Sequence, residues 1–512
     1  MSDFVVNNKK IAKNTIVLYL RMAFVMLVSF FTTRITLEVL GSEDYGLNNL
    51  VGGVVAMFSF INGSMGTAVQ RFYSIAIGEG NFDRLKKIFG CGLYLHLVVA
   101  IITLLLAEIF AFFFLHRLNI PAERMQAAHI VFQLAMASMC FNIINVPYTA
   151  LLRAREEFSI IAFADIISAL LRLLILYLLV TIKYDKLILF ALLNFMISLW
   201  SVGYLTYKAR KYEETHTSIC RDKNLIKEMI SFVSLLLFTV LAQVIRDNGL
   251  TVLVNLYFGL ALNAAFAIAI QVSHMVTTFV MNFKQAIVPQ LMTAWGADNK
   301  KAMLSLINIG TKVTFLLMLI LTVPIIFESN FILHIWLKEP PQHAEMLVSL
   351  AVLSINISSF TYFLYQAVHA TGKIKYQQLW MALLYVLNVI FIFVAFEHGG
   401  NHYFAYYITI VISSIQCVVN MYFAKKHIDL SLSDFCMNII LRSLLLFSIV
   451  VVSYYLLTIC VYAGWIRLIL GLITNTIICI IGGYIVLLNK EEKHIFRIKL
   501  IELTNIILLK KQ

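Results

Sequence analysis

The chain has 512 residues, of which 61% are hydrophobic and only 13% are charged, and its formal net charge is +13. That is more apolar surface than a soluble core can bury, and it extends along the whole length. The composition therefore excludes a soluble enzyme or binding domain and predicts a protein that crosses a membrane many times. The seven cysteines include no CxxC pair, so they predict neither a disulfide framework nor a metal site.

The apolar stretches have the length of membrane-spanning helices, for which about twenty residues suffice, and they lack the alternation of an outer-membrane barrel. We predict an all-α polytopic membrane protein with fourteen transmembrane helices. The first is too long for a signal peptide and lacks a small-residue cleavage site, so we expect it to be retained. The predicted spans are residues 14–40, 47–77, 88–114, 125–152, 160–182, 187–207, 230–258, 261–290, 303–327, 345–370, 378–396, 403–423, 437–460 and 465–488.

The basic residues indicate the orientation of the chain, because cytoplasmic loops retain Lys and Arg. With the N-terminus inside, the cytoplasmic segments hold twenty-six of the forty Lys and Arg residues. The outer segments hold five, namely Arg117, Arg124, Lys183, Lys186 and Lys338. We therefore predict that both termini are cytoplasmic. The positive net charge follows from this topology, and we expect no nucleic-acid partner, because no basic run is interleaved with base-stacking aromatic residues.

An internal repeat divides the chain. An offset of 218 residues pairs Gly41 with Gly259, Ala68 with Ala286, Gly78 with Gly296, and Asn81 with Asn299, and an offset of 216 pairs Ala154 with Ala370. Both offsets equate spans 1–6 with spans 7–12, which predicts two lobes in pseudo-twofold repeat with a cavity between them. The expected domains are an N-lobe at 1–207, a cytoplasmic linker at 208–224, a C-lobe at 225–424, the last two spans at 425–489, and a cytoplasmic amphipathic tail at 490–512.

Cations lie inside the apolar stretches, where each one needs a partner, a water-filled cavity or a nearby headgroup. Carboxylates in the same stretches are fewer, chiefly Glu38, Glu108, Asp165 and Asp247. This imbalance predicts an electropositive interior and an anionic substrate. The nine intramembrane cations are Arg21, Arg34, Arg71, Arg172, Arg246, Lys284, Lys312, Arg442 and Arg467.

Several segments resemble a known family. The run that begins at Asn14 contains NTIVLYLRM, then TRITLEVLGSEDYGLNNLVGGVVAMFSFINGSMGTAVQRF, then SIAIGEG, and the turn RAREEF follows the fourth span. These segments closely resemble Wzx-type oligosaccharide flippases of the MATE-like superfamily, which also includes lipid II flippases and multidrug exporters. The resemblance covers the full length. It implies a protein of the bacterial inner membrane that moves undecaprenyl-diphosphate-linked oligosaccharides, sugar first, to the periplasmic leaflet through a cationic cavity between two lobes.

The strongest candidate for a diphosphate contact is Arg246, which lies about twelve residues from either end of its predicted span and shares a polar stripe with Gln243. An Arg fork fits the oxygens of a diphosphate. The adjacent Asp247 is expected to face it poorly, because neighbouring residues on a helix diverge. Arg71 lies on a polar stripe of span 2 and is either a cavity residue or an interface anchor. Arg34 is either a substrate contact or the partner of Glu38, four residues later.

Span 8 offers two alternative polar faces. One face carries Gln271, His274 and Thr278, which are uncharged groups suited to sugar hydroxyls, although a lone His is more often a core residue. The other face carries Lys284 together with Ser273 and Thr277. Both faces cannot point squarely into one cavity. We favour the first for glycan contacts and retain Lys284 as a candidate.

The remaining cations have structural interpretations. Arg172 shares a helix face with Asp165 and is expected to pair with it, and Lys312 follows Asn308 by one turn. Arg442 and Arg467 lie near span ends, where we expect them to extend toward the headgroups. The turn LGSEDYG is predicted to be a tight outer turn bracketed by Gly41 and Gly46.

Three function classes compete. A multidrug exporter of the MATE type shares the fold but needs carboxylates to attract cations, and a membrane glycan polymerase is expected to carry a large outer loop, which is absent. We therefore expect a flippase and no enzyme. The chain has no GxxxxGK[ST] loop, so transport needs an ion gradient, a substrate gradient or a partner. Coupling to H⁺ or Na⁺ through Asp165, Glu108 or Asp247 stays open, and no other cofactor is expected. We expect the protein to be a monomer that works beside a glycan polymerase and glycosyltransferases.

Overall fold

The computed structural model describes residues 6–56, 59–114, 121–181, 184–217, 219–489 and 492–493. These described residues are overwhelmingly helical and contain no strand, which confirms the all-α prediction. The predicted tail at 490–512 lies outside them, apart from Glu492 and Lys493. The principal helices are α1 (Asn8–Ala56), α2 (Ser59–Gly78), α3 (Phe82–Phe114), α4 (Met125–Ala154), α5 (Phe158–Thr181), α6 (Lys186–Ala209), α7 (Lys223–Gly296), α8 (Lys300–Leu337), α9 (Ala344–Ser359), α10 (Tyr362–Thr371), α11 (Lys375–Glu397), α12 (Phe404–Ile428), α14 (Arg442–Cys460) and α15 (Trp465–Gly482).

Short elements fill the remaining connections. Three-residue 3₁₀ turns occupy Ala122–Arg124 and Glu213–Thr215, and the four-residue α13 (Leu432–Phe435) precedes α14. Single π-helical turns occupy Cys436–Leu441 and Gly483–Leu487, one at the start of α14 and one at the end of α15.

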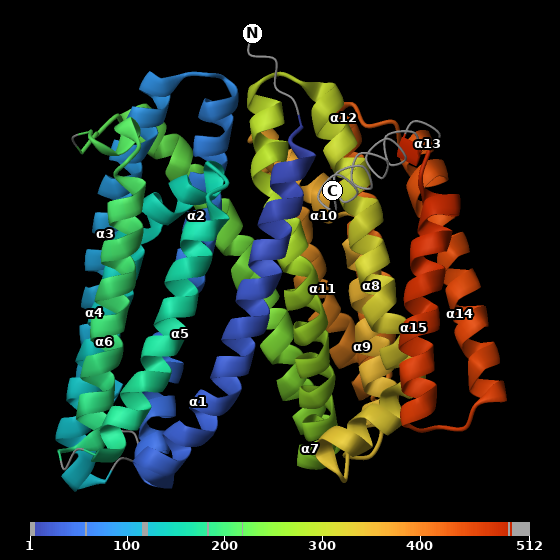
Figure 1. Cartoon of the computed structure of the whole chain (residues 1–512), viewed down its shortest axis with the longest axis horizontal. Helices are drawn as coiled ribbons and strands as arrows, with labels where there is room; N and C mark the ends of the chain where they lie inside the picture. The colour runs from blue at the N-terminus through green and yellow to red at the C-terminus, as the bar shows by residue number, and fades with distance from the viewer. Residues whose placement is uncertain are drawn as a thin grey trace, which may run out of the picture. The chain divides into compact units, whose positions relative to one another are not determined.

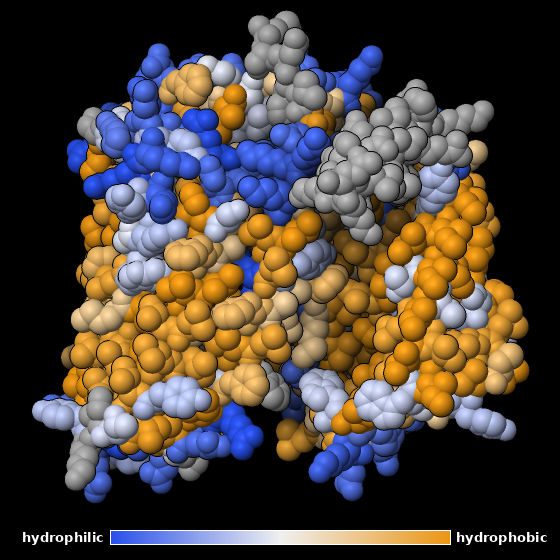
Figure 2. Space-filling model, viewed as in Figure 1, coloured by the Kyte–Doolittle hydropathy of each residue, from blue (hydrophilic) through white to orange (hydrophobic). Residues whose placement is uncertain are grey.

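The helices are long and apolar enough to cross a membrane. In the part of the chain that the structure describes, 11 helices meet this criterion, or 12 if α9 and α10, which meet at 41°, form one span. Figure 2 shows hydrophobic side chains over the middle of the helices and hydrophilic side chains over both ends. The protein is therefore a multi-span membrane protein. The exact number of fourteen spans stays a prediction.

The two longest helices are each broken at a glycine. Gly41 in α1 has φ 79° and Gly259 in α7 has φ 81°, a left-handed conformation that glycine adopts without steric cost. The offset of 218 residues pairs these two glycines with each other, so the repeat is visible in the backbone. The prediction of a turn bracketed by Gly41 and Gly46 is wrong in detail, because the helix has already resumed before Gly46.

The contacts within the chain divide it into two compact units. The first contains Met1–Leu241, Gln285–Met303 and His369–Gln378, and the second contains Ala242–Lys284, Leu304–Val368 and Leu379–Gln512. The contacts thus place both ends of α7 and the turn between α10 and α11 in the first unit. The lobe boundaries at 207 and 225 stay a prediction.

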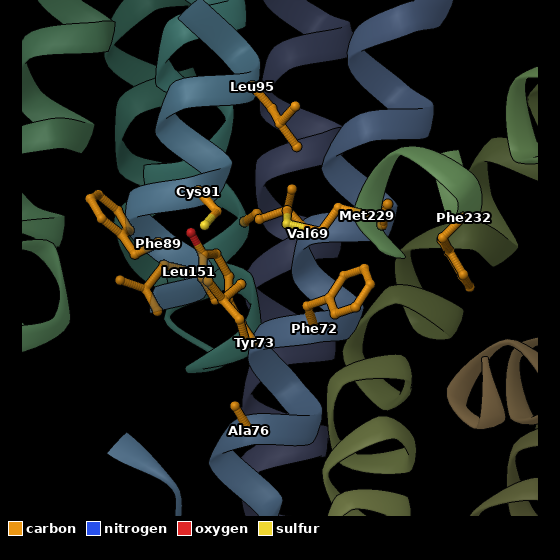
Figure 3. Close-up of a cluster of buried hydrophobic side chains, with 14 of the residues drawn as sticks. Val69, Phe72, Tyr73, Ala76, Phe89, Cys91, Leu95, Leu151, Met229 and Phe232 are labelled. Atoms are coloured by element: carbon orange, nitrogen blue, oxygen red, sulfur yellow. The ribbon is translucent and has the colours of Figure 1, made fainter. Parts of the chain in front are cut away.

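The first unit is a bundle around α4. This helix packs against α2, α3 and α6, while α1 packs against α5 (Figure 1). Its largest apolar cluster joins α2, α3, α4 and the start of α7. Figure 3 shows side chains of this cluster, including Phe72 and Tyr73 from α2, Phe89 from α3, Leu151 from α4 and Phe232 from α7.

Two large apolar clusters lie in the described part of the second unit. One joins α7, α9, α11 and α12, with α9 packed against α12. The other joins α8 to α14 and α15, with Phe315, Val450 and Tyr454 among its buried side chains. The last two long helices are therefore packed onto α8.

The turn between α4 and α5, part of the RAREEF motif, is tied to several segments of the first unit. Arg155 forms an ion pair with Glu214 at 2.7 Å. Glu156 accepts a hydrogen bond from Gln290 near the end of α7 at 2.9 Å, and Lys10 of α1 lies 3.7 Å from its carboxylate. Burial is the largest influence on Glu156 and raises the pKa of its carboxyl above the usual value.

Close backbone contact joins α2 to the end of α7 within the first unit. A Cβ on Gly78 would lie against the carbonyl of Thr293 and 2.8 Å from the nitrogen of Ala297, and a Cβ on Gly296 would lie 2.8 Å from the Cα of Ile75. The two halves of this contact are equivalent in the repeat, because the offset of 218 residues pairs Gly78 with Gly296 and Ile75 with Thr293. Only residues without a side chain let two helix backbones approach this closely.

We predict that Gly78→Ala lowers the thermal unfolding midpoint of the detergent-solubilised protein, because the new Cβ overlaps the backbone of α7. Overpacking of this kind costs about 1–3 kcal/mol. The matched control is Gly203→Ala in α6, where a Cβ meets nothing within 4 Å. There the better helix propensity of Ala should leave the midpoint unchanged or raise it. Equal midpoints for the two variants would contradict the assigned contact.

Candidate functional site

The first unit contains a partly open cavity of about 390 Å³ between α1 and α5, with a mixed polar and apolar lining. Its charged lining consists of Arg21 on α1 and Asp165 and Arg172 on α5, with Ser29, Thr32, Asn48 and Ser168 among its uncharged polar residues. Arg21 and Asp165 form an ion pair at 3.2 Å. Arg172 acts on Asp165 only at longer range. Two arginines therefore face one carboxylate.

Both arginines lie deep in their helices. Arg21 follows the start of α1 at Asn8 by thirteen residues, which is ~20 Å at the helical rise, and Arg172 precedes the end of α5 at Thr181 by nine residues, or ~14 Å. The expected pair of Arg172 with Asp165 is wrong in its partner, because Arg21 is the residue that forms it. Periodicity along α5 could indicate a shared face, but not a partner on another helix.

The second unit contains a partly open cavity of about 360 Å³. Gln243, Arg246 and Asp247 line it from the first part of α7, and Ser273, His274 and Thr277 line it from the part after Gly259. The lining from α9, α11 and α12 includes Ser354, Ser358, Asn388, Tyr406, Thr409 and Ser413. Most of these groups are uncharged hydrogen-bond donors and acceptors.

The charges in this second cavity balance each other. Nη2 and Nε of Arg246 lie 2.7 Å and 2.9 Å from the same carboxylate oxygen of Asp247, and the guanidinium lies 4.7 Å from the centre of the Tyr385 ring. The expectation that adjacent residues face each other poorly is therefore wrong here. The long arginine side chain bends sideways along the helix and reaches the short carboxylate beside it.

The two cavities occupy equivalent positions in the repeat. On α1 and α7, the offset of 218 pairs four lining residues of one cavity with four of the other: Val25 with Gln243, Val28 with Arg246, Ser29 with Asp247, and Thr32 with Leu250. On the later helices, the offset of 216 pairs Arg172 with Asn388 and Phe190 with Tyr406. The positions repeat but the charges do not. The first cavity has an additional arginine where the second has an amide.

A model of the family described as MatE matches residues 18–178 and 236–394, which together exceed half of the chain. The chain belongs to the MatE family. The two matched segments begin 218 residues apart, in agreement with the repeat. No curated protein matches the sequence.

Solved transporters share the fold of this MatE-family chain. A crystal structure of a mutant MATE protein has a TM-score of 0.72 at 13% identity, over 82% of this chain and 96% of the other. The MATE transporter ClbM in complex with Rb⁺ has 0.68 at 16% identity, over 83% and 96%. A MOP superfamily transporter from Pyrococcus furiosus, described by a binding pocket of reverse polarity, has 0.68 at 13%, over 83% and 96%. At these identities the likeness establishes the fold alone.

The predicted site residues separate into groups. Arg246, Gln243 and His274 meet in the second cavity. Gln271 and Thr278 do not line it and are exposed, because α7 turns Ser273 and Thr277 toward the cavity instead. The favoured face of span 8 therefore contributes only His274 to this cavity, and its contact with the glycan stays a prediction.

The other three candidates have different surroundings. Lys284 does not line this cavity, and its Nζ lies 4.4 Å from the centre of the Tyr362 ring. Arg34 is exposed and pairs with Glu38 at 3.0 Å, the alternative that the spacing offered. Arg71 is buried and does not line either cavity.

The three candidates for ion coupling lie in three different places. Asp165 and Asp247 each lie in one cavity beside an arginine, whereas Glu108 accepts a hydrogen bond from Gln133 at 3.1 Å on the exposed side of α3. Sequence reasoning did not single out Arg21 as a site residue. Arg21 lies four residues before Val25 and eight residues before Ser29, so its helix face shows no continuous polar stripe that would have indicated a site.

Three intramembrane cations of the second unit have side-chain partners, although two of them, Arg442 and Arg467, were expected to extend toward the headgroups. Arg467 binds Glu328 through Nε at 2.7 Å and Nη2 at 2.8 Å, and Glu328 is 0% exposed. Lys312 binds Glu492 at 2.7 Å. Arg442 donates to Asn489 at 3.0 Å. The predicted span boundaries put Glu328 in an outer loop, but α8 continues to Leu337 and includes Glu328 within the helix.

We predict that Arg467→Ala strongly destabilises the protein, because it leaves the Glu328 carboxylate buried without a counter-charge. Breaking such a pair costs about 3–5 kcal/mol. The control is Arg84→Ala, which breaks a partly exposed pair with Glu79 and should cost about 0–1 kcal/mol. Thermal unfolding in detergent measures both. A midpoint for Arg467→Ala equal to that of the control would refute the buried pair.

Proposed function

We propose that this MatE-family protein is a flippase that moves undecaprenyl-diphosphate-linked oligosaccharides from the cytoplasmic to the periplasmic leaflet of the bacterial inner membrane by alternating access. The observation that carries the proposal is the surplus of arginine in the first cavity, where Arg21 and Arg172 face a single carboxylate, Asp165. A diphosphate carries negative charge on oxygens that a guanidinium can bind with two parallel hydrogen bonds. Such bonds are stronger in a site shielded from water.

The chemistry of the second cavity also suits this substrate. Its lining includes the hydroxyl and amide groups of Ser354, Asn388 and Thr409, and the Arg246 charge is neutralised by Asp247. Uncharged donors and acceptors are the groups that bind sugar hydroxyls. In this proposal the protein works as a monomer, without enzymatic activity of its own, beside the glycosyltransferases and polymerase that make and extend the glycan.

A second candidate is export of cationic drugs. The fold favours it, because a multidrug resistance MATE transporter in an outward-facing conformation has a TM-score of 0.69 with this chain at 12% identity, over 82% of this chain and 96% of the other. The lining of the first cavity disfavours it, because a surplus of arginine repels cations.

We predict that Arg172→Ala reduces transport of the lipid-linked glycan about 10- to 100-fold, since a hydrogen bond to a charged group contributes about 1.5–3 kcal/mol. Arg172→Lys should retain part of the activity, because it keeps the charge but loses the fork. The measurement uses liposomes that contain the full-length protein and the undecaprenyl-diphosphate glycan extracted from the cells that make this protein. A membrane-impermeant glycosidase reports the sugar that reaches the opposite leaflet.

The matched control is Arg34→Ala, which removes an exposed arginine of α1 that already has a partner in Glu38. It should transport at the wild-type rate. If Arg172→Ala transports as fast as Arg34→Ala, the first cavity does not bind the diphosphate.

A separate experiment distinguishes the function classes. Liposomes with the wild-type protein should move the lipid-linked glycan without ATP and without changing its chain length, and they should not accumulate the cationic dye ethidium under a proton or sodium gradient. Gradient-driven uptake of ethidium without glycan movement would establish the exporter. A longer glycan would establish a polymerase.

A further inference from the structure

Arg71 is a buried cation that is held by backbone carbonyl groups. It lies on α2, its residue is 5% exposed, and it belongs to the first unit together with residues 369–378. Its Nε donates to the carbonyl of His369 at 2.6 Å and its Nη2 donates to the carbonyl of Ala370 at 3.1 Å. Both carbonyls belong to the last turn of α10, where carbonyl groups have no partner within the helix. The guanidinium therefore caps the C-terminus of α10.

The surroundings are shaped to the guanidinium. Its centre lies 4.9 Å from the ring of Phe72 and 4.7 Å from the ring of Phe232, which come from α2 and α7 (Figure 3). Gly372 follows α10 with φ 76°, and a Cβ there would lie 2.6 Å from Nη2 of Arg71. Glycine is thus required at this position both by its backbone conformation and by the approach of the arginine.

No carboxylate of the described residues forms an ion pair with Arg71, and Glu228 acts on it only at longer range. In this respect it differs from Arg21, Arg246 and Arg467, each of which pairs with a carboxylate. Carbonyl groups offer partial charges, whereas a phosphate offers full charges in a geometry that matches the fork. A buried cation without a counter-ion is costly to the folded state. Arg71 therefore retains a large unused capacity to bind an anion.

We propose that Arg71 is the binding site of an anion-operated latch. While the site is free of substrate, the carbonyls of His369 and Ala370 occupy the Nε and Nη2 edge of the guanidinium and hold the turn between α10 and α11. The diphosphate of the lipid-linked substrate takes the same edge and releases the turn. This proposal rests on the proposed function. The two partners exclude each other, so the anion shifts the balance between a held and a released turn by its preference for the released one.

Release would reach α7 through a short chain of hydrogen bonds. Nε2 of His369 lies 2.7 Å from Nε2 of Gln378, and the carbonyl of Gln378 accepts a bond from Oγ1 of Thr239 at 3.3 Å. Thr239 lies one turn before Gln243, which lines the second cavity.

The latch lies at the predicted cytoplasmic end of the first unit. Arg71 is on the same helix as Gly78, toward the end of the unit where Lys10 and the RAREEF turn lie, and the basic residues predict that this end is cytoplasmic. It is therefore placed at the side from which the substrate enters.

Hydrogen–deuterium exchange of the full-length protein in lipid nanodiscs tests the latch. Addition of undecaprenyl diphosphate should speed the exchange of the amides in residues 369–378 about tenfold in the wild type, which corresponds to about 1.4 kcal/mol. In Arg71→Gln the same amides should exchange fast without the lipid and should not respond to it. Gly372→Ala provides a second variant, because its Cβ displaces the guanidinium from the turn, and it should also exchange fast. Lys373→Ala, a change on the exposed turn itself, should behave as the wild type.

A further measurement with inorganic diphosphate identifies the ligand. Inorganic diphosphate should produce the same change only at higher concentration, because it is not concentrated at the membrane. A response at lower concentration than the lipid would overturn the assignment to the substrate. An unchanged rate in the wild type, or a response that persists in Arg71→Gln, would overturn the latch.

The liposome assay separates this proposal from the proposed function. If the wild type transports the glycan while undecaprenyl diphosphate leaves the exchange of residues 369–378 unchanged, the latch is wrong and the flippase stands. If diphosphate speeds the exchange but no glycan moves, the flippase is wrong while Arg71 remains an anion-operated latch.

Discussion

A cation within a membrane-spanning helix requires compensation, and the source of that compensation determines much of this structure. Arg467 and Lys312 obtain it from carboxylates on distant segments, Glu328 and Glu492. Both pairs join α8 to the end of the chain, one through α15 and the other through the residues that follow it. Together with the apolar cluster of α8, α14 and α15, they make the last two long helices an integral part of the second unit. Each pair neutralises one fully buried charged group, Lys312 in one and Glu328 in the other, so the partner of that group cannot be replaced alone.

The same requirement explains how a repeated fold acquired two different cavities. Gly41 and Gly259 break their helices with nearly the same positive φ, and several lining residues of the two cavities occupy equivalent positions in the repeat. The backbone therefore supplies two equivalent spaces. Within them, an arginine neutralised by its neighbour, as with Arg246, makes a cavity for uncharged groups, whereas the additional Arg172 leaves the other cavity positive. Divergence of a few side chains on a symmetric frame is enough to give one transporter two chemically distinct surfaces.

Much of this could be predicted from the sequence, for identifiable reasons. Apolar length determines the helices, and the glycines at 41 and 259 carry the repeat because only glycine tolerates that backbone conformation. The polar stripe on α7 correctly brought Gln243 and Arg246 to one cavity. Partnerships between helices were not predictable, because periodicity describes one helix at a time. The pairs of Arg21 with Asp165 and of Arg467 with Glu328 join residues more than 130 positions apart. Arg71 illustrates the same limit, since its partners are carbonyl groups that any sequence possesses.

An arginine that must exchange partners needs an internal partner of intermediate strength. If the internal partner is a carboxylate held by two nitrogens, as Asp247 is by Arg246, an incoming diphosphate has to displace a full charge and leave that carboxylate uncompensated. If the internal partners are two carbonyl groups, as for Arg71, the anion displaces only dipoles, and the released carbonyls can turn to water. The depth of Arg246 in its span first made it the stronger candidate for a diphosphate contact. Its partner reverses that order and places Arg71, whose charge has no carboxylate, ahead of it.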